Sequence, residues 1–163
     1  MGAGKTTVGR LLARRMKWQF IDLDDRIRER EQRSIPDIFR DSGEPHFRKI
    51  ETECLAALLE HALDKTVLAL GGGAFVQPGN AQIIRQSAIP VVFLDASPDT
   101  LLRRCAPQVG ERPLLASENQ FRQLYESRRE GYMTAGLRVD TTALTPEQVA
   151  DEIATRLDLP DYS

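Results

Sequence analysis

Apolar positions along the chain follow two different spacings, and these predict helices that alternate with strands. Within residues 4–16, Val8, Leu11, Leu12 and Met16 recur at spacings of three and four positions and would share one face of a helix. Within residues 89–94 the run IPVVFL is continuously apolar, which is typical of a strand buried on both faces. The same criteria predict further helices over residues 24–31, 34–39, 43–62, 78–86, 98–104, 118–134 and 146–157. They predict further strands over residues 19–21, 66–70 and 137–140.

Two of the predicted helices begin with residues that favour a helix N-terminus. Ser34 can accept a hydrogen bond from the first turn of its helix, and Pro36 lies in that turn. Thr145 can cap the last helix in the same way, with Pro146 at its first position. These signals support the predicted helix starts independently of the apolar spacing.

The alternation of strands and helices predicts an α/β fold with a parallel sheet flanked by helices on both faces. The length of 163 residues fits one domain, which we place at residues 1–163. Ligands in such folds bind beyond the carboxyl ends of the strands. Asp22, residues 71–73 and an arginine-containing loop at residues 105–116 follow strand ends or lie in loops. We therefore expect a site formed by these segments.

Composition narrows the class of protein. Apolar residues make up 41% and charged residues 28% of the chain, and the formal net charge is −2, which predicts a globular protein without nucleic-acid affinity. No apolar run approaches the roughly 20 residues of a membrane span. The start MGAGKTT predicts no signal peptide, and Cys54 and Cys105 are expected to be free thiols in a reducing cytosol. With no surplus apolar face, we expect a cytoplasmic monomer.

The first residues match the second half of the phosphate-loop pattern G-x-x-x-x-G-K-[ST]. The glycines allow backbone N–H groups to turn inward around phosphate oxygens, and the following helix offers its positive end. Lys5 would reach the β- and γ-phosphates, and the Thr6 hydroxyl would ligate Mg²⁺. A chance match without a phosphate role is the alternative. The predicted loop comprises Gly2, Ala3, Gly4, Lys5, Thr6 and Thr7.

The pattern also implies a segment ahead of the chain as it stands. Its first glycine would fall two positions before Met1, and a hydrophobic strand normally precedes that glycine. In phosphate-loop folds this strand lies in the middle of the sheet, so its loss leaves unpaired groups on two neighbouring strands at about 1–3 kcal/mol each. We therefore expect the chain to be truncated or its start site to be misassigned.

Two carboxylates follow the first predicted strand. If residues 22–24 are extended, Asp22 and Asp24 point the same way and can face one site. Asp22 would then hold Mg²⁺ through water, and Asp24 would accept a proton from a substrate hydroxyl or orient that hydroxyl. The alternative is that the pair forms a helix N-cap with a solvated partner.

Arginine outnumbers lysine in this chain, and several arginines are candidates for binding anions. Arg48 and Glu51 are three positions apart on a predicted helix, so Glu51 can hold a guanidinium that grips a substrate carboxylate. Arg112 lies in the loop 105–116, which we expect to act as a lid, and Arg128 lies on the next helix. The alternative for each is an exposed ion pair or a solvated side chain.

Three glycines in a row follow the predicted strand at residues 66–70. They make sense where a ligand or side chain must approach the main chain closely, because each glycine costs backbone entropy. A plain flexible turn is the alternative. The three residues are Gly71, Gly72 and Gly73.

Taken in order, these motifs resemble the shikimate kinase family. The segments that carry the resemblance are GAGKTTVGRLLA, FIDLD, SIPDIF, GEPHFRKIE, LALGGGA, RPLL and R-x-x-x-Y. Their order and spacing extend along nearly the whole chain, and other small phosphate-loop kinases are not expected to share the full set. The resemblance implies a three-layer phosphate-loop kinase of the nucleoside-monophosphate-kinase type. Its parallel sheet would have five strands in the order 2-3-1-4-5.

The resemblance also implies a reaction and roles for individual residues. ATP would phosphorylate the 3-hydroxyl of shikimate on the route to chorismate and the aromatic amino acids. Lys5, Asp24 and Arg112 would serve catalysis, and Thr6 and Asp22 would serve Mg²⁺. ATP would bind residues 2–7, Arg104, Arg112 and Pro146. The substrate-binding segment would span about residues 24–62. The residues that bind shikimate would be Asp24, Arg48, Gly71, Gly72, Gly73 and Arg128.

Two other functions remain open at this point. One is a kinase for another small hydroxy acid or sugar acid, such as gluconate. The feature that discriminates it from a shikimate kinase is the carboxylate clamp of Arg48 and Arg128 beside Asp24 and Gly72. The other is a non-catalytic, ligand-sensing domain, which a degraded phosphate loop would favour. Lys5, Thr6 and Asp22 are intact, and this argues for the enzyme.

Overall fold

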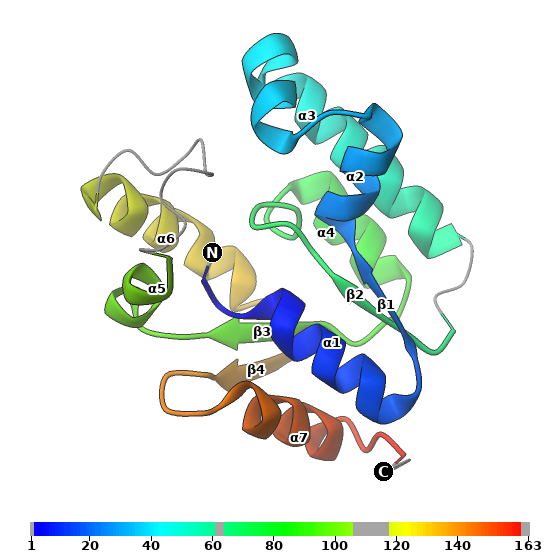
Figure 1. The fold of residues 1–163 in the computed structure, drawn as a ribbon, viewed down its shortest axis with the longest axis vertical. Coiled ribbons are helices and arrows are strands. Elements are labelled where there is room, and N and C mark those ends of the chain that lie inside the picture. The colour runs from blue at the N-terminus through cyan, green and yellow to red at the C-terminus, as the bar shows by residue number, and fades with distance from the viewer. Residues whose placement is uncertain (1, 61–63, 106–117, 161–163) are drawn as a thin grey trace.

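The computed structural model describes residues 2–60, 64–105 and 118–160 and has helices on either side of short parallel strands (Figure 1). The helices are α1 (Lys5–Met16), α2 (Leu23–Glu31), α3 (Ile35–Glu60), α4 (Pro78–Gln86), α5 (Pro98–Cys105), α6 (Glu118–Tyr132) and α7 (Pro146–Arg156). The strands are β1 (Gln19–Asp22), β2 (Thr66–Ala69), β3 (Val92–Asp95) and β4 (Leu137–Asp140). The predicted α/β class with parallel strands is confirmed.

The strands form two parallel pairs. β1 pairs with β2 in a register that joins Gln19 to Thr66, and β3 pairs with β4 in a register that joins Val92 to Leu137. Within the described ranges no strand joins β2 to β3. In the order 2-3-1-4-5 that the resemblance implies, β1 and β2 correspond to strands 2 and 3, and β3 and β4 correspond to strands 4 and 5. Strand 1 of that order would lie between the two pairs.

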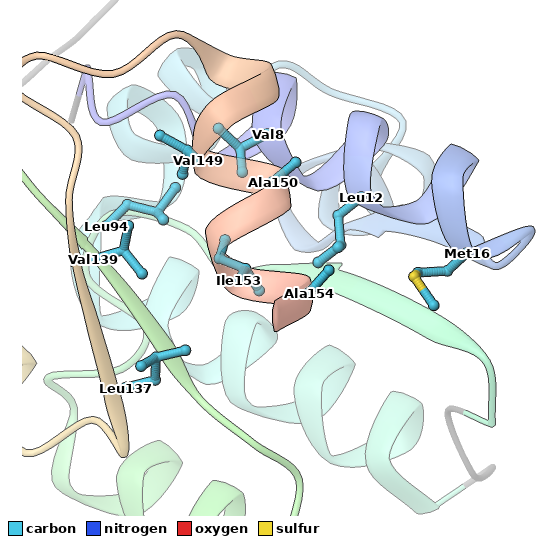
Figure 2. Close-up of a cluster of buried hydrophobic side chains, with 10 residues drawn as sticks. All are labelled: Val8, Leu12, Met16, Leu94, Leu137, Val139, Val149, Ala150, Ile153 and Ala154. Atoms are coloured by element: carbon cyan, nitrogen blue, oxygen red, sulfur yellow. The ribbon is translucent and has the colours of Figure 1, made fainter. Parts of the chain in front are cut away.

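Two apolar clusters cover the strands. The first packs α1 and α7 against β3 and β4, and Figure 2 shows Val8, Leu12 and Ile153 among its members. The second packs α2, α3 and α4 together, with Leu23 and Leu55 fully buried. Each fully buried leucine contributes about 1.5–3 kcal/mol of hydrophobic stabilisation. Val8, Leu12 and Met16, which the apolar spacing places on one face of α1, are buried in the first of these clusters.

Most predicted elements agree with the structure to within a few residues, and two differ. The helices expected at 34–39 and 43–62 are present as the two helical stretches of α3, which meet at a kink at Gly43, where φ is +80°. The strand expected at 89–94 begins only at Val92, since Pro90 lacks an N–H for the ladder. Asp24 lies in the first turn of α2, so the prediction of an extended segment at residues 22–24 is wrong.

The predicted helix caps are present. The backbone N–H of Asp37 donates to the Ser34 hydroxyl at 3.2 Å. Thr145 and Gln148 form a reciprocal capping box at the start of α7, with Pro146 at its first position. Cys54 and Cys105 are buried thiols, and neither is part of a disulfide. None of the described helices is long and apolar enough to cross a bilayer.

Candidate active site

The phosphate-loop segment leads directly into α1. Gly4 precedes the helix with φ +82°, a left-handed conformation that glycine adopts without a steric cost. The first turn of α1 carries no acidic residue, so its N–H groups and helix dipole favour an anion. Gly2 packs so closely on α5 that a Cβ there would approach the Leu101 carbonyl oxygen to 2.8 Å. Lys5 and Thr6 therefore lie where a bound phosphate would meet them.

Thr6 and Asp22 lie side by side, although 16 positions separate them. The Thr6 hydroxyl donates to Asp22 Oδ2 at 2.9 Å, and both side chains are partly buried. Asp22 Oδ1 also accepts from the backbone N–H of Asp24 at 3.1 Å, so Asp22 caps α2, as the N-cap alternative expected. A hydroxyl beside a carboxylate fits Mg²⁺, which binds few protein oxygens and keeps several waters. No group of three or more His, Cys, Asp or Glu side chains in the described ranges offers a metal cage.

Asp24 faces the glycine segment from the first turn of α2. A Cβ on Gly71 would lie 2.6 Å from Asp24 Oδ1 and 3.3 Å from Glu51 Oε1. Glycine at position 71 therefore leaves room for two carboxylates beside the main chain. The N-cap turn replaces the extended geometry that the sequence suggested, so that Asp22 contacts Thr6 whereas Asp24 faces Gly71.

Arg48 is held by two carboxylates of its own helix. Its Nη1 donates to Glu51 at 2.9 Å, and its Nη2 donates to Glu44 at 3.0 Å. Burial opposes the charge of Arg48, but these ion pairs outweigh burial and raise its pKa. Burial raises the pKa of Glu51, which is 1% exposed, and the nearby Asp24 carboxylate adds to this, whereas the pair with Arg48 opposes it. The ion pair predicted from the three-residue spacing is confirmed, and it is buried rather than exposed.

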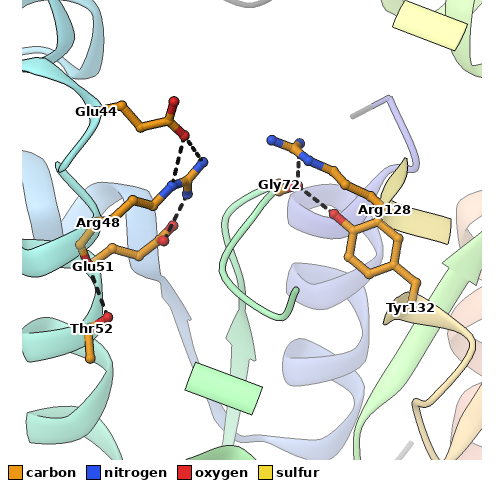
Figure 3. A network of polar contacts seen from close by, with 7 residues as sticks. All are labelled: Glu44, Arg48, Glu51, Thr52, Gly72, Arg128 and Tyr132. Carbon is orange, nitrogen blue, oxygen red and sulfur yellow. Dashed lines mark hydrogen bonds and ion pairs between the residues drawn. The ribbon is translucent and has the colours of Figure 1, made fainter. Parts of the chain in front are cut away.

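Arg128 reaches the same glycine segment from α6, across the space that Arg48 borders (Figure 3). Arg128 Nη1 and the Tyr132 hydroxyl both donate to the Gly72 carbonyl oxygen at 2.5 Å. A Cβ on Gly73 would lie 2.9 Å from both terminal nitrogens of Arg48 and 3.2 Å from Arg128 Nη2. The guanidinium groups of Arg48 on α3 and Arg128 on α6, which are 80 positions apart in the sequence, therefore converge at Gly73.

The convergence of two cations creates a preference for an anion. Burial lowers the pKa of Arg128, and the neighbouring Arg48 charge lowers it further. Burial also raises the pKa of Tyr132, so that residue supplies a neutral hydroxyl. A carboxylate placed between Arg48 and Arg128 would offset their repulsion through charge-assisted hydrogen bonds.

Two further predicted residues, Arg104 and Pro146, lie on α5 and at the start of α7. Arg104, on α5, donates to the Thr141 hydroxyl at 2.9 Å and to the Thr141 carbonyl oxygen at 2.7 Å. This links α5 to the segment between β4 and α7, which begins at Pro146. Arg112 and most of the predicted lid at 105–116 lie outside the described residues.

Sequence reasoning missed two contributors to the site. Tyr132 appears in the motif R-x-x-x-Y, but its bond to Gly72 joins residues 60 positions apart and has no local signal. Its ring also stacks on the Phe93 ring, with the two ring centroids 5.2 Å apart. Glu44 was missed as the second partner of Arg48, although the four-residue spacing on one helix would have allowed it.

Comparisons with known proteins agree with this geometry. The family model described as shikimate kinase matches residues 1–158. The chain belongs to the shikimate kinase family. Within this family, it is 44% identical to the shikimate kinase of Thermus thermophilus over 160 residues, which covers 96% of this chain and 85% of that protein. The Geobacter sulfurreducens shikimate kinase is 43% identical over 158 residues, covering 95% and 85%.

Solved structures of the family share the fold. Shikimate kinase from Acinetobacter baumannii in complex with shikimate superposes with a TM-score of 0.89 at 35% identity, covering 97% of this chain and 89% of that one. The Aquifex aeolicus shikimate kinase gives a TM-score of 0.84 at 35% identity, covering 97% and 92%. The resemblance that the ordered motifs suggested is confirmed over nearly the full chain.

Proposed function

We propose that this chain transfers the γ-phosphate of ATP to the 3-hydroxyl of shikimate, giving shikimate 3-phosphate and ADP. The observation that carries the proposal is the convergence of Arg48 and Arg128 at Gly73, close to the Asp24 carboxylate. This arrangement offers a carboxylate-binding fork beside a proton acceptor. Family membership supports the same reaction.

The chemistry needs one bond made and one bond broken. The substrate oxygen attacks the γ-phosphorus, and the bond between that phosphorus and the β–γ bridging oxygen breaks. Asp24 takes the hydroxyl proton, while Lys5 and the N-terminus of α1 neutralise charge on the phosphate oxygens. Arg48 and Arg128 fix the acceptor by its carboxylate, so its hydroxyl meets the phosphate in line.

Mg²⁺ fits the pair formed by Thr6 and Asp22. When bound, it would neutralise phosphate charge and orient the phosphate chain. The Thr6 hydroxyl would be a direct ligand, and Asp22 would hold a water of the metal's shell. Arg104 and Pro146 would flank the adenine, and Arg112 would contact ATP from the lid. We propose that the enzyme acts as a cytoplasmic monomer and as the single domain 1–163.

A coupled assay of ADP release tests the reaction. With ATP and Mg²⁺, we expect release to depend on shikimate and to yield a product heavier by one phosphate group. Turnover of gluconate in place of shikimate would favour the other hydroxy-acid kinase. Shikimate binding without any turnover would instead favour a ligand-sensing domain.

Replacing Arg48 or Arg128 with alanine should raise the KM for shikimate by about tenfold or more, since each charge-assisted bond is worth roughly 1.5–3 kcal/mol. The KM for ATP should move much less. Lysine at either position should restore only part of the affinity, because it keeps the charge and loses the fork. Arg40→Ala is the matched control, since Arg40 lies on α3 and its side chain is 69% exposed. Equal changes in both KM values would contradict the assignment.

Gly73→Ala should raise the KM for shikimate by about tenfold, because its methyl group would displace both guanidinium groups by a few tenths of an ångström. Gly79→Ala, at a position where a Cβ meets nothing within 4 Å, should leave the KM unchanged. Steady-state kinetics of the two variants side by side checks this. An unchanged KM in Gly73→Ala would show that the close approach at Gly73 has no part in substrate binding.

A further inference from the structure

A buried carboxylate that the proposed reaction does not use lies at the end of β3. Asp95 is the last residue of this strand and is 4% exposed. Burying a charged group is costly unless cations and hydrogen-bond donors surround it. The proposed reaction assigns no step to Asp95, so its buried charge needs another explanation.

The donors around Asp95 come from two different elements. Arg138 of β4 donates from Nε to Asp95 Oδ2 at 2.9 Å, and its Nη2 lies 2.8 Å from the same oxygen. From α6, the Tyr125 hydroxyl donates to Asp95 Oδ1 at 3.5 Å, and Arg129 Nη2 lies 3.7 Å from Asp95 Oδ2. Arg129 Nε also donates to the Tyr125 oxygen at 3.3 Å. Asp95 therefore ties α6 to the pair of strands β3 and β4.

The helix α6 buries little apolar surface that could fix its position. Phe121 is the one buried residue among the fifteen of this helix, all of which the structure describes. In contrast, α1 buries five of its twelve residues. Most helical stability in proteins comes from the packing of such an apolar face. The polar contacts at Asp95 therefore contribute more to the position of α6 than similar contacts contribute on a well-buried helix.

Arg129 is the direct neighbour of Arg128, which reaches the glycine segment. Successive residues on a helix point about 100° apart, so the two arginines leave α6 on different sides. Arg129 reaches Asp95, whereas Arg128 donates to the Gly72 carbonyl oxygen. A rotation of α6 that breaks the contact with Asp95 would therefore also move the Arg128 guanidinium relative to Gly73.

We propose that Asp95, acting through Tyr125 and Arg129, is a positioning residue that fixes the rotation of α6 and so places the Arg128 guanidinium for the acceptor carboxylate. The inference rests on the proposed function, since it deepens the role given there to Arg128. Its effect should fall on the KM for shikimate, because small misplacements of a clamp weaken the hold on its ligand. The phosphate loop before α1 should bind ATP as before.

The test removes the α6 side of this network and leaves the buried pair of Asp95 and Arg138 in place. In the double variant Tyr125→Phe/Arg129→Gln the aromatic ring remains, while the hydroxyl and the positive charge are lost. We expect the KM for shikimate to rise about fivefold, with kcat and the KM for ATP within about twofold of the parent. Arg129→Lys alone keeps the charge and the hydroxyl, so its KM for shikimate should stay close to that of the parent.

Arg122→Gln is the matched control on the same helix. Arg122 forms ion pairs with Asp99 and Glu118, and its side chain is 43% exposed. Exposed pairs of this kind contribute little, so the KM for shikimate should not change. A KM in the double variant equal to that of Arg122→Gln would overturn the proposal.

A second comparison asks whether the network acts through Arg128. In an Arg128→Ala protein, the same double substitution should change the KM for shikimate by less than about twofold, because the side chain that it positions is absent. An equal fold-change with and without Arg128 would overturn the proposal, since a general structural defect would act in both proteins.

Hydrogen exchange without ATP or shikimate separates this inference from the reaction. We expect the backbone amides of α6 to exchange faster in the double variant than in the parent and in Arg122→Gln. Unchanged exchange would overturn the anchoring of α6 at Asp95, whether or not the parent phosphorylates shikimate. A parent that does not phosphorylate shikimate, together with faster exchange in the double variant, would contradict the proposed reaction and support the anchoring.

Discussion

Lys5→Ala is expected to lower kcat by about three orders of magnitude while leaving the fold intact. Lys5 begins α1 directly after Gly4, and the proposed reaction has its ammonium group contact the γ-phosphate. Alanine is a good helix former, so α1 should persist. Steady-state kinetics, together with circular dichroism, would separate the loss of chemistry from a loss of structure.

Lys49→Ala serves as the control for this substitution. Lys49 is exposed on α3, next to Arg48, so its replacement removes one positive charge near the site without touching the phosphate loop. Its turnover should stay close to that of the parent. Turnover of Lys5→Ala within tenfold of the parent would contradict the role of Lys5.

Asp24→Asn should lower kcat by about 10²–10⁴-fold and leave the affinity for ATP nearly unchanged. The amide keeps the shape that fits beside Gly71 but cannot accept the hydroxyl proton. Because Asp22, rather than Asp24, lies beside Thr6, ATP and Mg²⁺ binding should survive. Calorimetric ATP binding and single-turnover kinetics would give the two quantities separately.

Asp25→Asn is the matched control on the same turn of α2. Asp25 forms an ion pair with Arg28 on the outer side of the helix, so its replacement should have little effect on kcat. Equal losses of ATP affinity and turnover in Asp24→Asn would instead mark Asp24 as a structural or metal-binding residue.

Local patterns predicted much of this molecule from its sequence. The spacing of Val8, Leu11, Leu12 and Met16 predicted the inner face of α1, although Leu11 is only partly buried. The three-residue spacing of Arg48 and Glu51 predicted their ion pair. Such signals are reliable because the helix itself fixes which side chains are neighbours. The glycine run was likewise a sound indication of close approach to the main chain.

The parts that escaped prediction depend on long-range packing or on competition between local conformations. Nothing near Tyr132 in the sequence indicates that its hydroxyl meets Gly72. The pair of Asp22 and Asp24 suggested an extended segment. The backbone N–H of Asp24 instead donates to the Asp22 carboxylate, and this cap starts α2 at Leu23, one residue earlier than expected. In this turn Asp22 contacts Thr6, and Asp24 faces Gly71.

The most direct measurement compares shikimate with an analogue in which an amide replaces the carboxylate. The central claim is that Arg48 and Arg128 together bind that carboxylate at Gly73. The parent enzyme should strongly prefer shikimate in kcat/KM, and the variant with both arginines replaced by alanine should barely distinguish the two compounds. If the parent phosphorylates both equally well, the clamp is wrong, and a neutral polyol becomes the better substrate.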